Sequence, residues 1–424
     1  MYCAELLDVL NRGTLDSRLG ELYGGDAASN RARLANLVIT FESAFPGLQV
    51  GLFSAPGRTE MGGNHTDHQL GRVLAGSVDL DMVACAGVNG TNVITVQSAG
   101  YPAVVVSLDD LDVREDELGT SSALVRGIAR ALHDRGFDVQ GVSIVMESKV
   151  LGGSGLSSSA AYEILIGVIL NHFCCDGALS AVELAQIGQY AENRFFGKPS
   201  GLMDQLACSV GGVVFIDFAT PGEPVIERID IDLASYGYAL CIIDSGADHA
   251  DLTDEYTGII EELRGVSEYF GVQYLSQVAE PEFWQRFAEV RAATSDRAVL
   301  RAAHFFDDTA RVSLQKQALA AGRFDDFLEL VTASGISSST QLQNIFPAVD
   351  PRVQPVNVTL MVAKHLLGGR GAVRVHGGGF AGTVQAYVPV DLLDGFRAGV
   401  DGVLGDGSCH VLTIRPVGGA VIAA

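Results

Sequence analysis

The sequence has few basic residues and no long uncharged apolar run. Only 28 lysines and arginines stand against 51 aspartates and glutamates, so the formal net charge is −23 at pH 7. So acidic a chain repels nucleic acid and anionic lipid surfaces, and we expect it to bind neither. No apolar run approaches the roughly 18 residues that a membrane-spanning helix needs. We therefore expect no membrane span.

Cysteine is also sparse, and its distribution favours neither disulfides nor a metal site. The seven cysteines form an odd set without a Cys-x-x-Cys pair. The first residues do not have a basic leader before a long apolar segment, and they include Glu5 and Asp8. From these features we expect reduced thiols, no export signal and a cytoplasmic protein.

The sequence does contain enough apolar residues for a large core. Hydrophobic residues make up 48% of the 424 positions, and this length predicts two or three domains or one large composite. Helical spacing of apolar residues predicts helices over 31–44, 121–135, 157–173, 180–196 and much of 249–345. Apolar alternation and apolar runs predict strands over 48–56, 139–148, 238–244, 372–388 and 409–416, and within 72–108. The predicted fold class is mixed α+β.

Local sequence predicts two turns and one domain boundary. Pro56–Gly57 should end the first strand, which makes 54–73 a loop that follows it. Asn89–Gly90 predicts a hairpin turn. A polar, turn-rich segment at 220–238 predicts a division between an α/β N-terminal domain and an α+β C-terminal domain, at residues 1–230 and 231–424.

The predicted loop, SAPGRTEMGGNHTDHQLGRV, concentrates polar groups between small residues. His65 and Asp67 offer hydrogen-bond donors and acceptors at a fixed spacing, which suits a ligand rich in hydroxyl groups. The same residues with His68 are metal-ligand types, but no further ligand stands at a recognisable spacing, which disfavours a metallohydrolase. Arg58 could instead form a structural ion pair with Asp67.

Two glycine-rich stretches follow this loop. In GGSGLSSSAA (152–161), glycines precede serines and a helical pattern, so free backbone N–H groups and a helix N-terminus meet, as a phosphate site requires. A glycine-rich turn with a serine N-cap explains the same pattern. In HGGGFAG (376–382), small residues between two strands indicate a tight turn or a close approach of backbone to a ligand.

In this order, GRTEMGGNHTDH (57–68), GGSGLSSSAA and HGGGFAG resemble the three signature motifs of one family of small-molecule kinases. The family groups galactokinase, homoserine kinase, mevalonate kinase and phosphomevalonate kinase. The resemblance is greatest to galactokinases, to which PSGLMDQLACSVGG (199–212) and HADLTDEY (249–256) are also similar. It implies a two-domain kinase fold with the active site between the domains. It also implies ATP and Mg²⁺ as cofactors, and phosphorylation of the anomeric hydroxyl of galactose to galactose 1-phosphate.

The resemblance further implies roles for single residues. At the reacting groups it places Asp204 as general base and Arg58 beside the transferred phosphoryl group. The sugar-binding residues would be Asn64, His65, Asp67, Gly201 and Tyr256. Those around the ATP phosphates would be Gly152, Gly153, Ser154, Gly155, Leu156, Ser157 and Ser158. Magnesium would be held by Glu192 with Ser158 or Ser159. Without the resemblance, a role as helix cap is a less favoured alternative for Asp204, and a place on a solvated helix face is an alternative for Glu192.

The sequence departs from the galactokinase pattern in the motif that the resemblance places at the sugar. Asn64 stands where galactokinases usually have glutamate, and His68 where they usually have tyrosine. Galacturonate kinases are similar in having an uncharged residue at the first position. The alternatives are therefore a kinase for galacturonate or another hexose derivative, and an inactive sugar sensor of the same fold. The intact serines at 157–159 favour an enzyme.

Overall fold

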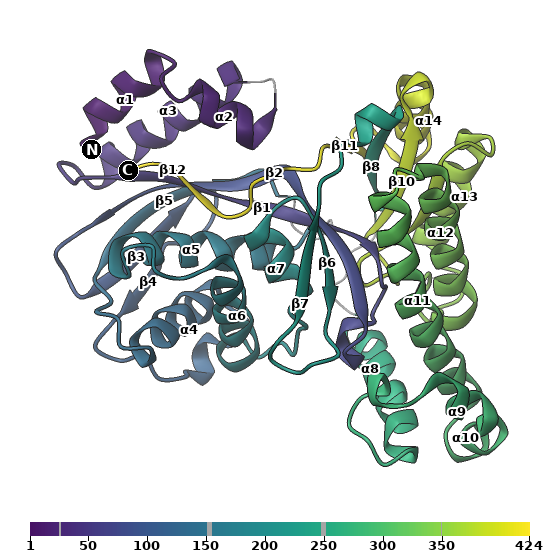
Figure 1. The fold of residues 1–424 in the computed structure, drawn as a ribbon. Coiled ribbons are helices and arrows are strands. Elements are labelled where there is room, and N and C mark those ends of the chain that lie inside the picture. The colour runs from purple at the N-terminus through teal and green to yellow at the C-terminus, as the bar shows by residue number, and fades with distance from the viewer. Residues whose placement is uncertain (25–26, 151–154, 247–251, 349) are drawn as a thin grey trace.

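Two β-sheets, each packed against helices, make up the structure, as Figure 1 shows. The computed structural model describes residues 1–24, 27–150, 155–246, 252–348 and 350–424. The first sheet has eight strands in the order β12-β1-β2-β5-β3-β4, with β6 pairing with β2, and β7 with β6. These strands are β1 (Gly51–Gly62), β2 (Arg72–Val88), β3 (Val93–Ser98), β4 (Val104–Ser107), β5 (Val142–Ser148), β6 (Val213–Asp217), β7 (Val225–Ile229) and β12 (Ala420–Ala423).

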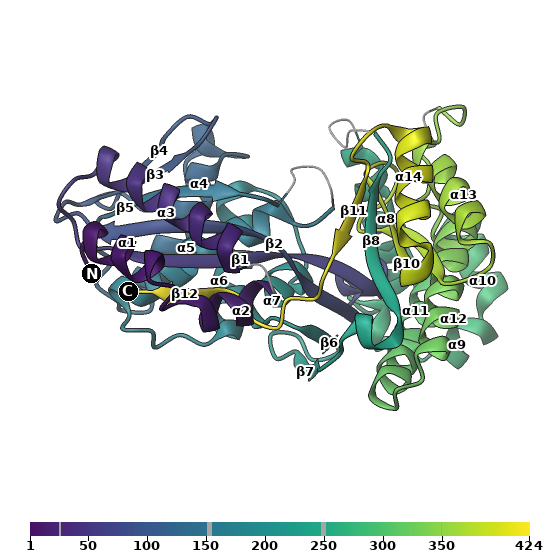
Figure 2. The same ribbon diagram turned by 90° about the horizontal axis from the view of Figure 1, so that it is seen from above.

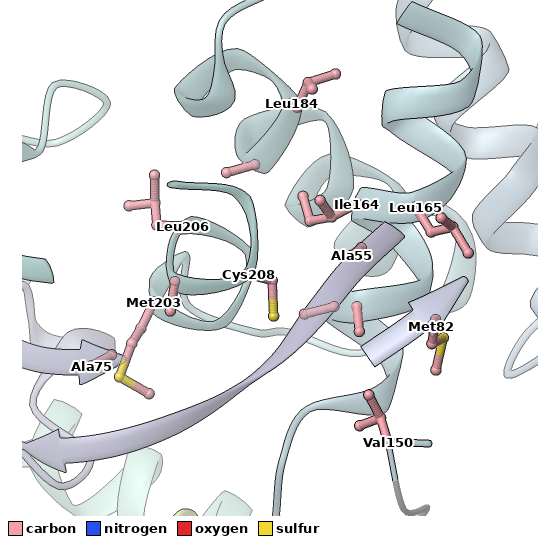
Figure 3. Close-up of a cluster of buried hydrophobic side chains, with 14 of the residues drawn as sticks. Ala55, Ala75, Met82, Val150, Ile164, Leu165, Leu184, Met203, Leu206 and Cys208 are labelled. Carbon is pink, nitrogen blue, oxygen red and sulfur yellow. The ribbon is translucent and has the colours of Figure 1, made fainter. Parts of the chain in front are cut away.

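Helices cover both faces of the first sheet (Figure 1). On one face lie α1 (Cys3–Asn11), α2 (Asp16–Tyr23) and α3 (Ala27–Ala44). On the other lie α4 (Ser121–Asp134), α5 (Ser158–Cys174), α6 (Ala181–Ala191) and α7 (Met203–Val210). Because helices cover it on both sides, β1 is buried along its whole length. Figure 3 shows part of the resulting core, where Ala55 of β1 packs near Ile164 of α5 and Leu206 of α7.

The second sheet has four strands in the order β11-β8-β10-β9. They are β8 (Tyr238–Asp244), β9 (Ala372–His376), β10 (Thr383–Pro389) and β11 (Cys409–Leu412). The helices grouped with it are α8 (Thr253–Tyr269), α9 (Glu280–Gln285), α10 (Phe287–Ala293), α11 (Asp296–Ala320), α12 (Phe324–Ser337), α13 (Pro355–Leu367) and α14 (Leu393–Leu404). Seen from above in Figure 2, β1 and β2 reach from the first sheet toward this group, and β2 contacts α11. After β11 the chain returns to the first sheet, where β12 pairs antiparallel with β1.

The helices predicted in the first half of the chain are confirmed as α3, α4, α5 and α6. Helix α6 begins where the sequence provides a capping box, in which Ser180 Oγ accepts from the N–H of Glu183 and the Glu183 carboxylate accepts from the N–H of Ser180. The strands predicted at 139–148, 238–244 and 372–388 are confirmed as β5, β8 and the pair β9 and β10. Among the helices of the described residues, none combines the length and apolar character needed to cross a membrane.

The prediction that the first strand ends at Pro56–Gly57 is wrong, because β1 continues to Gly62. β12 pairs with β1 only from Leu52 to Ser54. At Pro56, within the described chain, β1 therefore has β2 on one side and no strand on the other. Such an edge position tolerates proline, and the register with β2 shifts there, between Pro56 and Arg58. Residues 57–62 of the predicted loop are therefore strand residues. The side chains of Arg58 and Glu60, two positions apart, point to the same face.

The predicted hairpin at Asn89–Gly90 is also wrong. The turn exists, with Gly90 at φ +68°, but the strands that it joins, β2 and β3, are not neighbours. β5 lies between them, antiparallel to β2 and parallel to β3. The first five residues of β5 are buried. At the centre of the sheet this apolar strand is covered, whereas at an edge it would be exposed.

Candidate active site

A cavity of about 520 Å³ lies between the first sheet and the helices of the second. Its wall comes from β1, the start of α5, the segment 198–204, α8 and the turn after β9. The predicted site residues on this wall are Arg58, His65, Asp67, Gly155, Leu156, Ser157, Ser158, Ser159, Gly201, Asp204 and Tyr256. Asn64 and Glu192 are buried behind it. Gly152, Gly153 and Ser154 lie outside the described residues.

Arg58 and Asp204 form a bidentate ion pair at the centre of the wall. Arg58 Nε donates to Asp204 Oδ1 at 2.7 Å, and Nη2 donates to Oδ2 at 2.9 Å. Ser157 Oγ also donates to Asp204 Oδ2. Burial alone would raise the pKa of Asp204, but the charge of Arg58 and the hydrogen bonds from Arg58 and Ser157 lower it below its usual value. Asp204, in the first turn of α7, is therefore an ionised carboxylate whose partner is Arg58, whereas Asp67 is not paired with this arginine.

Arg58 also fixes the chain segment that leads into α5. Its backbone N–H donates to Leu156 O at 3.0 Å, and its Nη1 donates to Gly155 O. Ser157, at the N-cap of α5, has a left-handed backbone with φ +57°. The N-terminus of the 17-residue helix α5 therefore opens on the cavity beside Arg58. Its free N–H groups and helix dipole favour an anion there.

Ser159 and Glu192 supply the oxygen ligands that a magnesium ion prefers. Ser159 Oγ donates to Glu192 Oε1 at 3.1 Å, and Lys198 Nζ donates to the same oxygen at 2.8 Å. Glu192 begins a π-helical turn, Glu192–Phe196, directly after α6. Because magnesium is usually held by one or two carboxylates together with substrate phosphates, a hydroxyl and a carboxylate beside the helix N-terminus fit this ion.

The alternative metal cluster of His65, Asp67 and His68 is not formed. In the part of the chain that the structure describes, no group of three or more His, Cys, Asp or Glu side chains is arranged to hold a metal ion. His65 has its Nε2 2.9 Å from the carbonyl oxygen of Gly378. Since a carbonyl only accepts, Nε2 carries the proton and Nδ1 is left as an acceptor. Burial and the nearby His68 lower the pKa of His65 to about 3, so the ring is neutral.

Tyr256 of α8 stacks on His65 and closes this side of the cavity. The two ring centroids are 6.4 Å apart, and the Tyr256 hydroxyl donates to Gly379 O at 3.0 Å. Gly378 lies beneath the tyrosine ring, where a Cβ atom would come within 2.5 Å of Tyr256 Cε1. The HGGGFAG stretch therefore lets the backbone approach a ring on the cavity wall, and the expected approach to a ligand stays a prediction.

The Asp67 carboxylate is available to a ligand. Its side chain lies on the wall at the start of a short 3₁₀ turn, Asp67–Gln69. Across the described residues, no donor makes a hydrogen bond to it, and His68 Nε2 is 3.9 Å from Oδ1. Gly201 lies so close that a Cβ atom there would be 2.0 Å from Asp67 Oδ2. The predicted role of Gly201 at the sugar thus has a steric basis, since a side chain would displace Asp67.

Asn64 is completely buried, and its amide is used within the protein. Nδ2 donates to Glu60 Oε1 at 3.0 Å and to Gly377 O at 2.7 Å, while Oδ1 accepts from Asn344 Nδ2 at 2.8 Å. Helix α11 holds its backbone: the N–H of Asn64 donates to Asp308 Oδ2 and its C=O accepts from His304 Nε2, both at 2.9 Å. Asn64 therefore anchors the segment before His65 and does not reach the wall.

The wall also carries residues that the sequence analysis missed, among them Glu60, Lys198 and Gly377. Strand alternation from Arg58 would have found Glu60 if β1 had been predicted to pass Pro56. Burial raises the pKa of Glu60 to about 7; Arg374 and Arg58 oppose this rise, whereas Asp308 and Asp67 add to it. The other wall residues that were given no role are Pro199, Ser200, Met203, Thr257, Ile260 and Gly378, whereas His68 was considered as a metal-ligand type and as a departure from galactokinases.

Comparison with known families gives two matches in the sequence. Residues 118–212 match the GHMP kinases N terminal domain, where GHMP stands for the four kinases named above, and residues 39–88 match the galactokinase galactose-binding signature. The first contains α5, Glu192 and Asp204, and the second contains Arg58 and residues 64–68.

Solved structures give the same fold. Lactococcus lactis galactokinase complexed with galactose is 24% identical, with 92% of this chain and 99% of that chain covered and a TM-score of 0.79. Mevalonate kinase from L. major, in complex with R-mevalonate, is 14% identical, with 88% and 97% covered and a TM-score of 0.58. Streptococcus pneumoniae phosphomevalonate kinase, in complex with phosphomevalonate and AMPPNP, is 10% identical, with 85% and 98% covered and a TM-score of 0.59. The predicted mixed α+β fold and the resemblance to galactokinases are confirmed.

Proposed function

We propose that this chain, a galactokinase-like kinase of the GHMP family, transfers the γ-phosphoryl group of ATP to the anomeric hydroxyl of galactose. The observation that best supports this reaction is the Arg58–Asp204 pair, which lies between two kinds of surface. On one side is the N-terminus of α5, suited to phosphates, and on the other are His65, Asp67 and Tyr256, suited to hydroxyl groups. A phosphoryl donor on the first surface and a hydroxyl acceptor on the second would meet beside this pair.

Asp204 would orient the attacking hydroxyl group and receive its proton. As the sugar oxygen bonds to the γ-phosphorus, the bond from that phosphorus to ADP breaks and the hydroxyl proton passes to the Asp204 carboxylate. The lowered pKa of Asp204 keeps the carboxylate ionised before the reaction, ready to accept this hydrogen bond. It also means that proton transfer accompanies phosphoryl transfer and does not precede it.

Arg58 and α5 would stabilise the charge on the transferred group. The guanidinium is fixed by Asp204 and by Gly155 O, so it is already in place when a phosphoryl group arrives. We propose that Gly155 to Ser158, with Gly152 to Ser154 before them, surround the ATP phosphates. Ser159 and Glu192 would hold Mg²⁺, which when bound neutralises charge on the phosphate oxygens.

The sugar would lie against the opposite wall. The neutral His65 ring offers Nδ1, and Asp67 offers two carboxylate oxygens, so both can accept hydrogen bonds from sugar hydroxyl groups. Tyr256 and Gly201 bound the same space.

We propose that the active site lies between the two predicted domains. We also propose that the enzyme is cytoplasmic, where its seven free cysteines would stay reduced.

Release of ADP, measured by a coupled assay over hexoses and hexuronates, tests this proposal. We expect Mg²⁺-dependent ADP release with galactose above the background ATP hydrolysis, and a lower kcat/KM with galacturonate. A higher kcat/KM with galacturonate would support the alternative substrate. Sugar binding without ADP release for any sugar would support the inactive sensor.

A further inference from the structure

Glu60 lies on the cavity wall with one carboxylate oxygen almost free. Its side chain is only 3% exposed, and it points to the same face of β1 as Arg58. Oε1 is occupied, because Arg374 Nη2 and Asn64 Nδ2 both donate to it. Oε2 receives only a second, longer contact of 3.4 Å from the same Asn64 nitrogen, and no other described residue donates to it. A buried carboxylate oxygen with spare acceptor capacity on a cavity wall can accept a hydrogen bond from a ligand in the cavity.

The support behind Glu60 fixes its orientation. Asn64 Nδ2 is shared between Glu60 and Gly377 O, and Asn64 Oδ1 is held by Asn344 and, at 3.3 Å, by Ser338 Oγ. Asn64 can neither turn toward the cavity nor release Glu60 without losing these bonds. Arg374 is fully buried and donates to the same carboxylate oxygen, Oε1, as Asn64 does. The amide and the guanidinium together present Oε2 in one direction.

The charges on the wall disfavour an anionic sugar. Glu60, Asp67 and Asp204 are three carboxylates on one wall. Among the described wall residues, both permanently cationic side chains already face a carboxylate: Arg58 faces Asp204, and Lys198 faces Glu192. Of the two histidines, His68 lies 3.9 Å from Asp67, and His65 is neutral and bonded to Gly378 O. A hexuronate would bring a fourth carboxylate without a spare cation to meet it.

We propose that Glu60 is the specificity-determining residue of the sugar site: its Oε2 accepts a hydrogen bond from one sugar hydroxyl group, and its carboxylate excludes hexuronates. Asn64 and Arg374 are positioning residues that act through Glu60. This inference rests on the proposed function, because it requires a sugar in the cavity.

Glu60→Gln, assayed on galactose and on each monodeoxygalactose that keeps the anomeric hydroxyl group, tests the contact itself. A hydrogen bond to a charged group is worth about 1.5–3 kcal/mol, so we expect kcat/KM for galactose to fall roughly 10- to 100-fold. One of these deoxy sugars lacks the hydroxyl group that donates to Glu60. With that sugar, wild type and variant should have equal kcat/KM. The variant should also lose discrimination between galactose and galacturonate, while KM for ATP stays within about twofold of wild type.

Glu117→Gln is the matched control, because it also removes a carboxylate from a buried arginine, Arg126, and neither residue lines the cavity. It should lower stability without changing the order of the sugars. If Glu60→Gln does not fold, Glu60→Asp keeps the charge for Arg374 but withdraws the accepting oxygen by one methylene group. The same fall with galactose is then expected, while discrimination against galacturonate is kept.

An equal loss of kcat/KM on every sugar would overturn the inference and leave the proposed function standing. A wild-type preference for galacturonate over galactose would overturn the exclusion. Absence of phosphorylation of any sugar by the wild type would overturn the proposed function and this inference with it.

Discussion

Replacing Asp204 by asparagine separates proton transfer from substrate binding. Asparagine has the size of aspartate, and its one oxygen still accepts from Arg58 or Ser157, but it cannot take up a proton. Loss of a general base typically lowers kcat by about 10²- to 10⁴-fold. The sugar contacts proposed for His65 and Asp67 do not depend on residue 204. We therefore expect the sugar dissociation constant to change by no more than a few-fold.

The same substitution has a small predicted effect on stability. Removing one member of a buried ion pair costs about 3–5 kcal/mol, because the other charge is left buried. The Arg58 side chain is 7% exposed, but Asp204 is 28% exposed, and the amide keeps one hydrogen bond. The expected cost is therefore about 1–2 kcal/mol, which lowers Tm by roughly 2–6 °C in a domain of this size.

ADP release gives kcat, calorimetry gives sugar affinity, and thermal unfolding gives Tm. Asp217→Asn is the matched control, because Asp217 also pairs with an arginine, Arg72, at 2.7 Å, and does not line the cavity. It should lower Tm with kcat unchanged. The reasoning fails if Asp204→Asn retains more than a tenth of wild-type kcat. It also fails if kcat falls only in proportion to lost sugar binding or lost folded protein.

Two further predictions follow from the charges around the cavity. Because the pKa of Glu60 is raised to about 7 and the ionised form is the stronger acceptor, KM for galactose should fall as pH rises from about 6 to 8. A KM independent of pH in wild type, or the same dependence in Glu60→Gln, would contradict this. Lys198 Nζ donates to Oε1 of Glu192, which we propose as a ligand of the metal. Lys198→Met should therefore tighten Mn²⁺ binding, measured by electron paramagnetic resonance without nucleotide. Lys316→Met, whose lysine pairs with Glu227 on the surface, should leave Mn²⁺ affinity unchanged, and weaker binding in Lys198→Met would count against the assignment.

The fold class could be predicted from the sequence because helix period and cap chemistry are local. Helix α6 begins at Ser180, with Glu183 three residues later, and both residues are visible in the sequence. The course of β1 was not predictable in this way, since Pro56 is tolerated only because β12, from the end of the chain, stops at Ser54. The place of β5 between β2 and β3 likewise depends on pairings distant in sequence.

In the candidate site, too, some residues could be predicted from local sequence and others depend on contacts distant in the chain. Motif resemblance predicted that Arg58, Asp204 and the start of α5 belong to one site, because they belong to continuous signatures, and all three line the same cavity. It did not predict that Glu60 lies on the cavity wall and that Asn64 is buried behind it. Arg374 holds Glu60 on the wall, whereas Asn344 and Asp308 hold Asn64 behind it. These partners come more than two hundred residues later in the chain and meet Glu60 and Asn64 only in the folded protein.

The central claim is that galactose is phosphorylated at its anomeric oxygen by ATP. Phosphorus-31 NMR of a reaction with galactose, Mg²⁺ and ATP tests it directly, because a phosphoester on the anomeric carbon couples to the anomeric proton alone. We expect stoichiometric ADP and galactose 1-phosphate from wild type, and formation of both at least about 10²-fold more slowly by Asp204→Asn. A phosphoester at another hydroxyl group, or ADP and inorganic phosphate without a sugar phosphate, would contradict it.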